Sequence, residues 1–199
     1  MSIVQWKNLK KAFHAYGKEP NFNVWQLKDG RHRICNGYFV INTKDQPTGA
    51  GLTFLINNFN EMPEPNSLMK RHGKDHIEKL KESDGEVFNG SERVIDNVSS
   101  KNDIPQTKLE KTGITLEKIK NSGDFMDVVV FYNPTDKNYV FIRKEFVEMV
   151  SPDITAYGSS QIKPVYFVED APEDHRDFIM IMPIRQTQEI KFLADPKYL

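Results

Sequence analysis

The chain has 199 residues, with 27 Lys or Arg against 28 Asp or Glu, a formal net charge of −1 and a mean hydropathy of −0.58. These values are typical of a soluble protein of one or two domains, and no apolar run approaches the roughly 20 residues that a membrane helix needs. The first residues lack the basic start and apolar block of a signal peptide. A single cysteine, Cys35, excludes a disulfide framework. We therefore expect a cytoplasmic protein with no membrane partner.

The positive charge is concentrated at the start of the chain. Residues 1–44 contain eight Lys or Arg but only two acidic residues, Glu19 and Asp29. Such asymmetry in a nearly neutral protein is typical of a surface that binds a polyanion. Chance clustering on a solvated face explains it equally well, so both interpretations stay open.

The first predicted elements are a helix and three strands. Apolar residues recur at helical spacing from Ile3 to Tyr16, with lysines on another face, which predicts an amphipathic helix with a basic stripe. Two strand-like runs, 22–27 and 34–41, flank Asp29-Gly30, a dipeptide typical of hairpin turns. The apolar run 52–57 predicts a third strand.

The middle of the chain is less regular. A helix is predicted from about Ser67 to Glu82, and a loop over 84–108, where Ser, Asn, Asp and Gly dominate. Strands are predicted again after that loop, with a short helix from Arg143 to Val150 among them. The predicted strands are 113–117, 126–132, 139–142, 154–157, 162–168 and 177–184.

The order of these elements is similar at the two ends of the chain, each with a helix followed by strands. We therefore predict an α+β fold with repeated units of a helix and antiparallel strands around an irregular middle. The predicted division is an N-terminal half at 1–60, an insertion or linker at 61–112, and a C-terminal half at 113–199. No residue-level repeat accompanies this order.

The most informative segment is an apolar run, Phe178 to Met182, that ends at Pro183. Because no polar residue alternates with the apolar ones, this strand is expected to be buried on both faces or to lie under a groove. Proline ends the ladder, since it has no N–H to donate. The segment is either a surface that holds another protein or an ordinary core strand.

The region from Tyr139 to Arg185, ending in Met182-Pro183-Ile184-Arg185, resembles the C-terminal part of the bacterial DNA sliding clamp, the β subunit of DNA polymerase III. In that family a strand leads to a helix over the DNA hole, three strands follow, and the last strand ends in a similar tetrapeptide. The resemblance covers roughly 50 residues, and the tetrapeptide is its specific part.

The resemblance implies a processivity factor with no catalytic residues and no cofactor. Its partners would be the backbone of duplex DNA, bound without sequence specificity, and a replication protein that carries a clamp-binding peptide. A homo-oligomer is also implied. The implied peptide-binding residues are Met180, Met182, Pro183 and Ile184, and the implied DNA-binding residues are Lys7, Lys10, Lys11, Lys18, Arg143 and Lys144.

The chain departs from the family in two respects. It is much shorter than a three-domain clamp subunit, so ring closure is an open question. Residues 186–199 follow the tetrapeptide, where the family's chain usually ends, and Phe192 and Leu193 are apolar enough to fold back into the groove. Oligomer number and the identity of the partner stay open as well.

Motifs for other chemistry are missing from the sequence. His72 and His76 are spaced to chelate a metal from one helix, but no third ligand follows the His-Glu-x-x-His pattern, so no metal site is predicted. No nucleophile elbow, phosphate loop or dinucleotide fingerprint is present. We expect a non-enzymatic sliding-clamp-like scaffold of DNA replication or repair. The alternatives are a ring-less clamp-like protein that binds or inhibits a replication protein, and an enzyme on an unrelated α+β fold.

Overall fold

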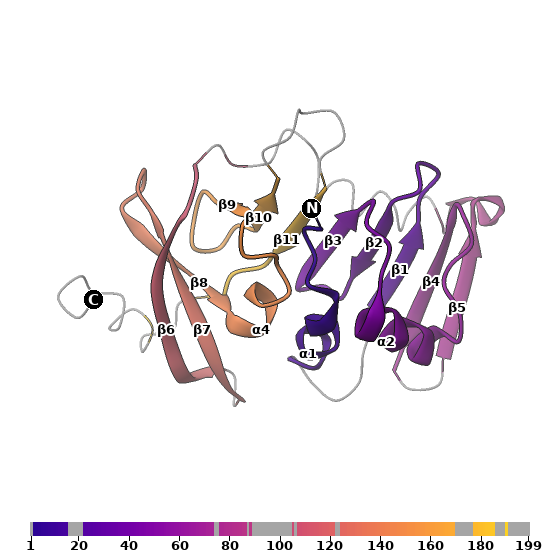
Figure 1. The fold of residues 1–199 in the computed structure, drawn as a ribbon, viewed down its shortest axis with the longest axis horizontal. Coiled ribbons are helices and arrows are strands. Elements are labelled where there is room, and N and C mark those ends of the chain that lie inside the picture. The colour runs from indigo at the N-terminus through magenta and orange to yellow at the C-terminus, as the bar shows by residue number, and fades with distance from the viewer. Residues whose placement is uncertain are drawn as a thin grey trace.

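The fold is an α+β arrangement of two antiparallel sheets, with short helices against one face of the large sheet, as seen in a computed structural model of the chain (Figure 1). The large sheet has eight strands in the order β5-β4-β1-β2-β3-β11-β10-β9, and the small sheet has the order β6-β7-β8. The predicted α+β class is confirmed. The structure describes residues 2–15, 22–73, 76–86, 88, 105, 107–121, 124–169, 177–185 and 190.

The N-terminal segment begins with a helix followed by strands, as predicted, but the three strands are not the three predicted ones. A 3₁₀ turn, Trp6–Asn8, precedes helix α1, Leu9–His14. The predicted strand at 34–41 is split by a turn at Asn36 and Gly37, where Gly37 has a φ of 84° that suits glycine. The three strands are β1 (Phe22–Gln26), β2 (His32–Cys35) and β3 (Phe39–Thr43).

Two element predictions are wrong. The run 52–57, predicted as a strand, lies in helix α2, Gly49–Phe59, because its buried residues are spaced by three to four and face the sheet. The segment from Ser67 to Glu82, predicted as a helix, forms a hairpin of β4 (Ser67–His72) and β5 (His76–Lys81), and a 3₁₀ turn, Glu82–Asp84, follows it. Pairing of β4 with β1 along five residues outweighs the helical spacing.

The C-terminal segment begins with a meander of three strands and continues as a helix with three more. Helix α4 is shorter than predicted, and each of the three last strands is shorter than its predicted range. The elements are β6 (Glu110–Asn121), β7 (Asp124–Asn133), β8 (Asn138–Arg143), α4 (Lys144–Val147), β9 (Thr155–Tyr157), β10 (Val165–Val168) and β11 (Phe178–Ile181).

The two helix-plus-three-strand segments meet in the middle of the large sheet. Their strands lie in the order β1-β2-β3-β11-β10-β9, so the last strand of each segment lies at the seam. There β3 is antiparallel to β11, and Ile41 lies opposite Ile179. Helices α1 and α4 lie next to each other on one face of this sheet (Figure 1). The side chain of Asn8 donates a hydrogen bond of 2.6 Å to the carbonyl of Glu148, just after α4. Each segment therefore contributes one helix and three strands on its own side of this seam.

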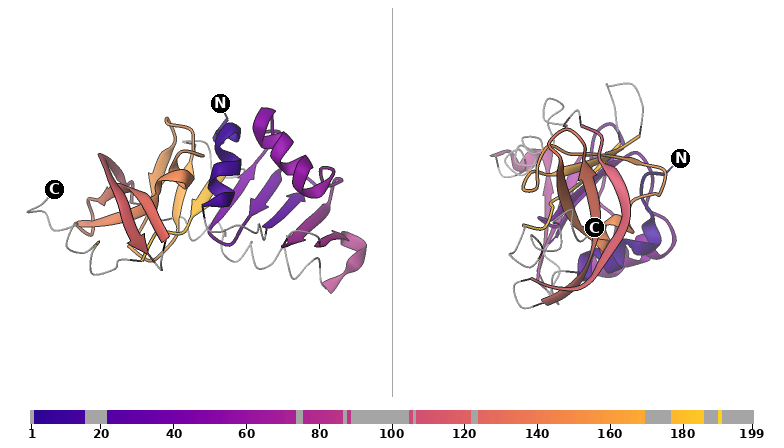
Figure 2. Two further views of the ribbon diagram at one scale, coloured as in Figure 1. Left: turned by 90° about the horizontal axis from the view of Figure 1, so that it is seen from below. Right: turned by 90° about the vertical axis from the view of Figure 1, so that its left-hand side faces the viewer.

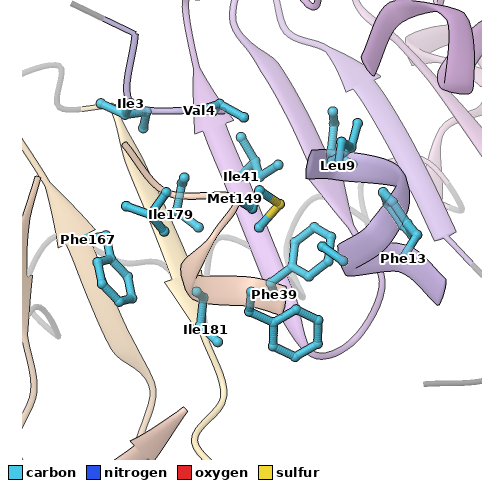
Figure 3. Packing of buried hydrophobic residues seen from close by; sticks show 14 of the residues in the cluster. Ile3, Val4, Leu9, Phe13, Phe39, Ile41, Met149, Phe167, Ile179 and Ile181 are labelled. Atoms are coloured by element: carbon cyan, nitrogen blue, oxygen red, sulfur yellow. The ribbon is translucent and has the colours of Figure 1, made fainter. Parts of the chain in front are cut away.

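The face of the large sheet that carries these helices forms the main core. Phe39 and Ile41 of β3 and Ile179 and Ile181 of β11 point toward Leu9 and Phe13 of α1 and toward Met149 (Figure 3). The ring of Phe13 lies 4.3 Å from that of Phe22 and 5.1 Å from that of Phe39. Burial of these apolar side chains fixes α1 and α4 onto the seam between the two segments.

The opposite face of the large sheet carries a second apolar cluster. Trp25, Leu68 and Met180 are buried there, and Phe88 packs against them. Both faces of the central strands are thus apolar, which explains why their sequences lack polar alternation.

The small sheet is joined to both edges of the C-terminal part of the large sheet. At one side, the amide of Leu109 donates to the carbonyl of Ala156, and the amide of Gly158 donates to the carbonyl of Thr107, so residues 107–109, just before β6, pair with β9. At the other side, the amide of Ile184 donates to the carbonyl of Phe141 in β8. Residues of β7 and β8 therefore share the main core with Phe167 of β10 and Phe146 of α4. Figure 2 shows the two sheets from two further sides.

The predicted division at residues 60 and 112 stays a prediction. The large sheet takes strands from both predicted halves, and the hairpin β4–β5 lies within the segment expected to be irregular. The loop predicted for 84–108 lies almost wholly outside the described residues. Among the helices that the structure describes, none is long and apolar enough to cross a membrane.

Candidate functional site: a lysine-rimmed groove

A groove of about 560 Å³ lies where the chain leaves its pairing with β9 of the large sheet and continues as β6 of the small sheet. One wall is the first part of β6 with its bulge at Gly113, and the other is α4 with the connection from Val150 to Thr155. Gln5, Lys7 and Asn8 of the N-terminal segment also line it. With its floor included, the groove is assembled from five parts of the chain.

The walls are held in place by main-chain pairing. Val4 forms an isolated bridge with Val150, and the amide of Ser151 donates to the carbonyl of Ile3 at 2.9 Å. In β6, the hydroxyl of Thr112 donates to the carbonyl of Val130 at 2.8 Å, at the bulge where the ladder with β7 is interrupted. These bonds fix the width of the groove from both sides.

The floor of the groove is apolar. Val129 and Phe131 of β7, Ala156 of β9 and Phe167 of β10 lie beneath it and belong to the main core. Val147 and Ile154 line it while only partly buried, so they present apolar surface to the opening. An apolar floor with polar groups at its rim is the usual composition of a binding site.

The rim carries four lysines, Lys7, Lys108, Lys111 and Lys144, and two acidic residues, Glu148 and Asp153. The Lys144 ammonium lies 3.4 Å from an Asp127 carboxylate oxygen, and the Glu148 carboxylate lies 2.5 Å from the ammonium of Lys11. Lys7, Lys108 and Lys111 form no ion pair within the described part of the chain and are exposed. The rim therefore has an excess of positive charge available to a ligand.

The neighbouring ion pairs shift the pKa values of their members. The hydrogen bond from Lys11 to Glu148 raises the pKa of the Lys11 ammonium. The backbone N–H of Lys118, followed by the nearby ammonium of Lys144, lowers the pKa of the Asp127 carboxyl. Both pairs are partly solvated, so each contributes at most about 1 kcal/mol to stability.

The residues predicted to bind DNA lie in different environments. Lys7, Lys10 and Lys11 are exposed on the 3₁₀ turn and α1, while Lys144 begins α4 beside them and is half-exposed. Arg143 is buried, and its Nε lies 3.1 Å from the carboxylate of Glu145. Lys18 lies outside the described residues. The structure thus brings four of the six predicted residues onto neighbouring helices.

The residues predicted to bind a peptide do not share one surface. Met180 is buried in the cluster around Trp25 and Phe88, whereas Ile184 is buried against the outer face of the small sheet. Pro183 is buried between them and ends β11 as predicted, and Met182 is half-buried. Of the tail at 186–199, only Ile190 is described, and it packs in the same cluster as Ile184.

The sequence did not single out Lys108, Lys111 or Ile154, which line the groove. The available signal was weak, since lysines of an exposed strand and an isolated Ile beside Pro152-Asp153 are common on any surface. Only the pairing of residues 107–109 with β9 brings these positions together.

The remaining candidate ligands do not assemble into a site. His72 and His76 face each other across the β4–β5 hairpin with ring centroids 5.8 Å apart, and Glu78 lies 3.7 Å from His72. The described residues contain no group of three or more His, Cys, Asp or Glu that could hold a metal. Burial raises the pKa of the Cys35 thiol, so its reactive thiolate form is disfavoured.

No family model, no curated protein and no solved structure matches this chain.

Proposed function

We propose that this chain is a non-enzymatic, clamp-like scaffold of DNA replication or repair that binds the backbone of duplex DNA without sequence specificity. One observation carries the proposal. The two helix-plus-three-strand segments meet at β3 and β11 and place α1 and α4 side by side on one face of the sheet. This is the arrangement that the resemblance to the sliding clamp implies, and α1 carries exposed lysines.

The lysines differ in how readily they can contact phosphate. Lys7 and Lys10 are exposed and form no ion pair within the described chain, so they lose little on binding DNA. Lys11 and Lys144 already form ion pairs with Glu148 and Asp127, and these carboxylates would compete with phosphate for the two ammonium groups. The proposal therefore assigns most of the binding energy to Lys7 and Lys10, with Lys11 and Lys144 in support.

Duplex DNA binding should depend steeply on salt, because phosphate binding releases condensed counterions. We expect the double variant Lys7→Gln/Lys10→Gln to bind more weakly at low salt. The slope of log affinity against log salt should shrink by roughly 0.9 for each phosphate that the variant no longer neutralises. Fluorescence anisotropy with a labelled duplex between about 50 and 200 mM salt measures both quantities.

The matched control is Lys79→Gln/Lys81→Gln. These two exposed lysines lie on β5, at the far edge of the large sheet, and pair with Glu61 and Glu64. The control should bind DNA as the unaltered chain does. An equal decrease of affinity in both double variants, or no binding of the unaltered chain at low salt, would reject the DNA-binding proposal.

A second candidate function is a ring-less clamp-like protein that binds a replication protein. The observation that favours it is the state of the sheet edges. The outer edge of β9 is occupied by residues 107–109 of the same chain, so it does not offer a neighbouring copy a full strand to pair with. A closed ring built by extending the sheet from copy to copy needs two open edges.

A further inference from the structure

We propose that the lysine-rimmed groove is a docking site for an extended peptide segment of a partner protein, in which apolar side chains alternate with acidic ones. The site differs from the one expected at Met180 to Ile184, whose residues are largely buried. The inference does not depend on DNA binding, and its test uses lysines outside the predicted DNA-binding set.

The position of the groove suits an extended chain. Leu109, Gly113 and Thr115 line it together with Val147 and Ile154, so the groove borders β6, a strand at the edge of the small sheet. A segment that lies in it would run alongside β6, where the bulge at Gly113 interrupts regular pairing. Extended peptides that lie along a strand gain affinity from the main chain and specificity from pockets for alternate side chains.

The apolar floor provides those pockets. Val147 and Ile154 are only partly buried, although they pack on a fully buried core that includes Val129 and Phe167. An apolar side chain placed between them would be removed from water at roughly 25 cal/mol for each Å² buried. The peptide would therefore direct every second side chain, of the Leu, Ile or Val kind, to the floor.

The charge of the rim selects acidic neighbours for those apolar residues. Lys108 and Lys111 are exposed on the β6 side, and Lys7 of the N-terminal segment is exposed as well. Because Glu148 is already paired with Lys11, Asp153 is the rim carboxylate that would repel an acidic peptide. Rim charges of this kind steer association and reject partners of like charge.

The test is a selection of random peptides displayed on phage against the unaltered chain, followed by titration of an enriched synthetic peptide. We expect enriched peptides to alternate Asp or Glu with Leu, Ile or Val. The variant Lys108→Glu/Lys111→Glu should bind such a peptide on the order of tenfold more weakly, since it replaces attraction with repulsion. An analogue of the peptide in which Lys replaces the acidic residues should bind this variant more tightly than the original peptide does.

The matched control is Lys120→Glu/Lys163→Glu, which changes two exposed lysines outside the groove by the same charge. It should bind the peptide unchanged, as should Lys10→Gln. A thermal melt of each variant checks that it is folded. The proposal is overturned if no peptide is enriched or if both double variants weaken binding equally. It is also overturned if decanoate, a small amphipathic anion, competes as well as the peptide, because the groove would then be a site for such anions.

Discussion

His32 is a buried histidine whose charge state is tied to folding. It is 2% exposed in β2, and its Nε2 lies 2.8 Å from the side-chain oxygen of Gln46, while its Nδ1 has no hydrogen-bond partner among the described residues. Burial lowers the pKa of the imidazole, and the bond to Gln46 offsets only part of that effect. The folded state therefore favours neutral His32.

This burial predicts a loss of stability in mild acid. Because the folded-state pKa lies below the ordinary value of 6.5, the unfolded chain binds more protons, and stability falls as the pH drops below about 6.5. We expect His32→Gln to flatten the dependence of the melting temperature on pH between about 7.5 and 5.5. His72 is exposed, so the control variant His72→Gln should keep the slope of melting temperature against pH. An unchanged slope in His32→Gln would contradict this role.

Gly51 decides how closely helix α2 approaches the N-terminal segment. A Cβ at this position would lie 2.7 Å from the carbonyl oxygen of Trp6 and 2.9 Å from its Cβ. Neither atom belongs to the flexible end of a side chain, so the two elements would have to move apart. The absence of a side chain at Gly51 thus allows α2 to pack against the 3₁₀ turn.

Gly51→Ala should destabilise the protein despite the better helix propensity of alanine. Propensity alone would favour alanine by about 1 kcal/mol, whereas forcing an atom into this contact costs about 1–3 kcal/mol in a packed core. Urea denaturation should show a lower midpoint. Asn57→Ala, on the exposed face of the same helix, should raise the midpoint or leave it unchanged. A Gly51→Ala midpoint equal to or above that of the unaltered chain would contradict this expectation, because separating the elements would then cost no more than the propensity gain.

Local signals predicted some elements and failed at others for identifiable reasons. Asp29-Gly30 correctly predicted a hairpin turn, and the valines of β7 correctly predicted a buried strand. Both features depend on a few adjacent residues, so the local sequence is enough to predict them. The run 52–57 is too short to tell a buried strand from a helix face, and Gly49 and Gly51 obscured the start of α2. At β4, the partner strand β1 decided the conformation, and no local pattern records that partner.

The candidate site was less predictable than the fold. The basic character of the N-terminal segment could be seen in the sequence, and Lys7 proved to be both exposed and at the groove. The other wall depends on the pairing of residues 107–109 with β9, which joins chain segments that are distant in sequence. The burial of Arg143 could not be foreseen either, because its position at the end of β8 is fixed by the sheet.

At the scale of the whole molecule, the sheet edges limit how copies can assemble. Within the described strands of the large sheet, β5 pairs with β4 alone, while β9 is covered by residues 107–109. Extension of the large sheet between copies would therefore join two β5 strands across a two-fold axis. Lys79 and Lys81 on β5 weaken such pairing, since charged edge strands discourage association.

We expect light scattering over a range of concentrations to give a mass that rises from that of one chain, 23.1 kDa, toward that of two. A weak two-fold dimer agrees with one open, lysine-bearing edge in the described large sheet. A mass of three or more chains would contradict the edge argument and support a closed ring. A strict monomer at every concentration would contradict self-association and favour the ring-less function.

The seam between β3 and β11 also determines when the protein can fold during its synthesis. Thr43 and Asp177, whose side chains share a hydrogen bond of 2.5 Å beside this seam, are 134 residues apart. Until the ribosome has released β11, the edge of β3 and the apolar residues Phe39 and Ile41 have no strand to cover them. The nascent chain must therefore carry an exposed, aggregation-prone edge for most of its translation. A chaperone that covers this edge would protect it during that interval.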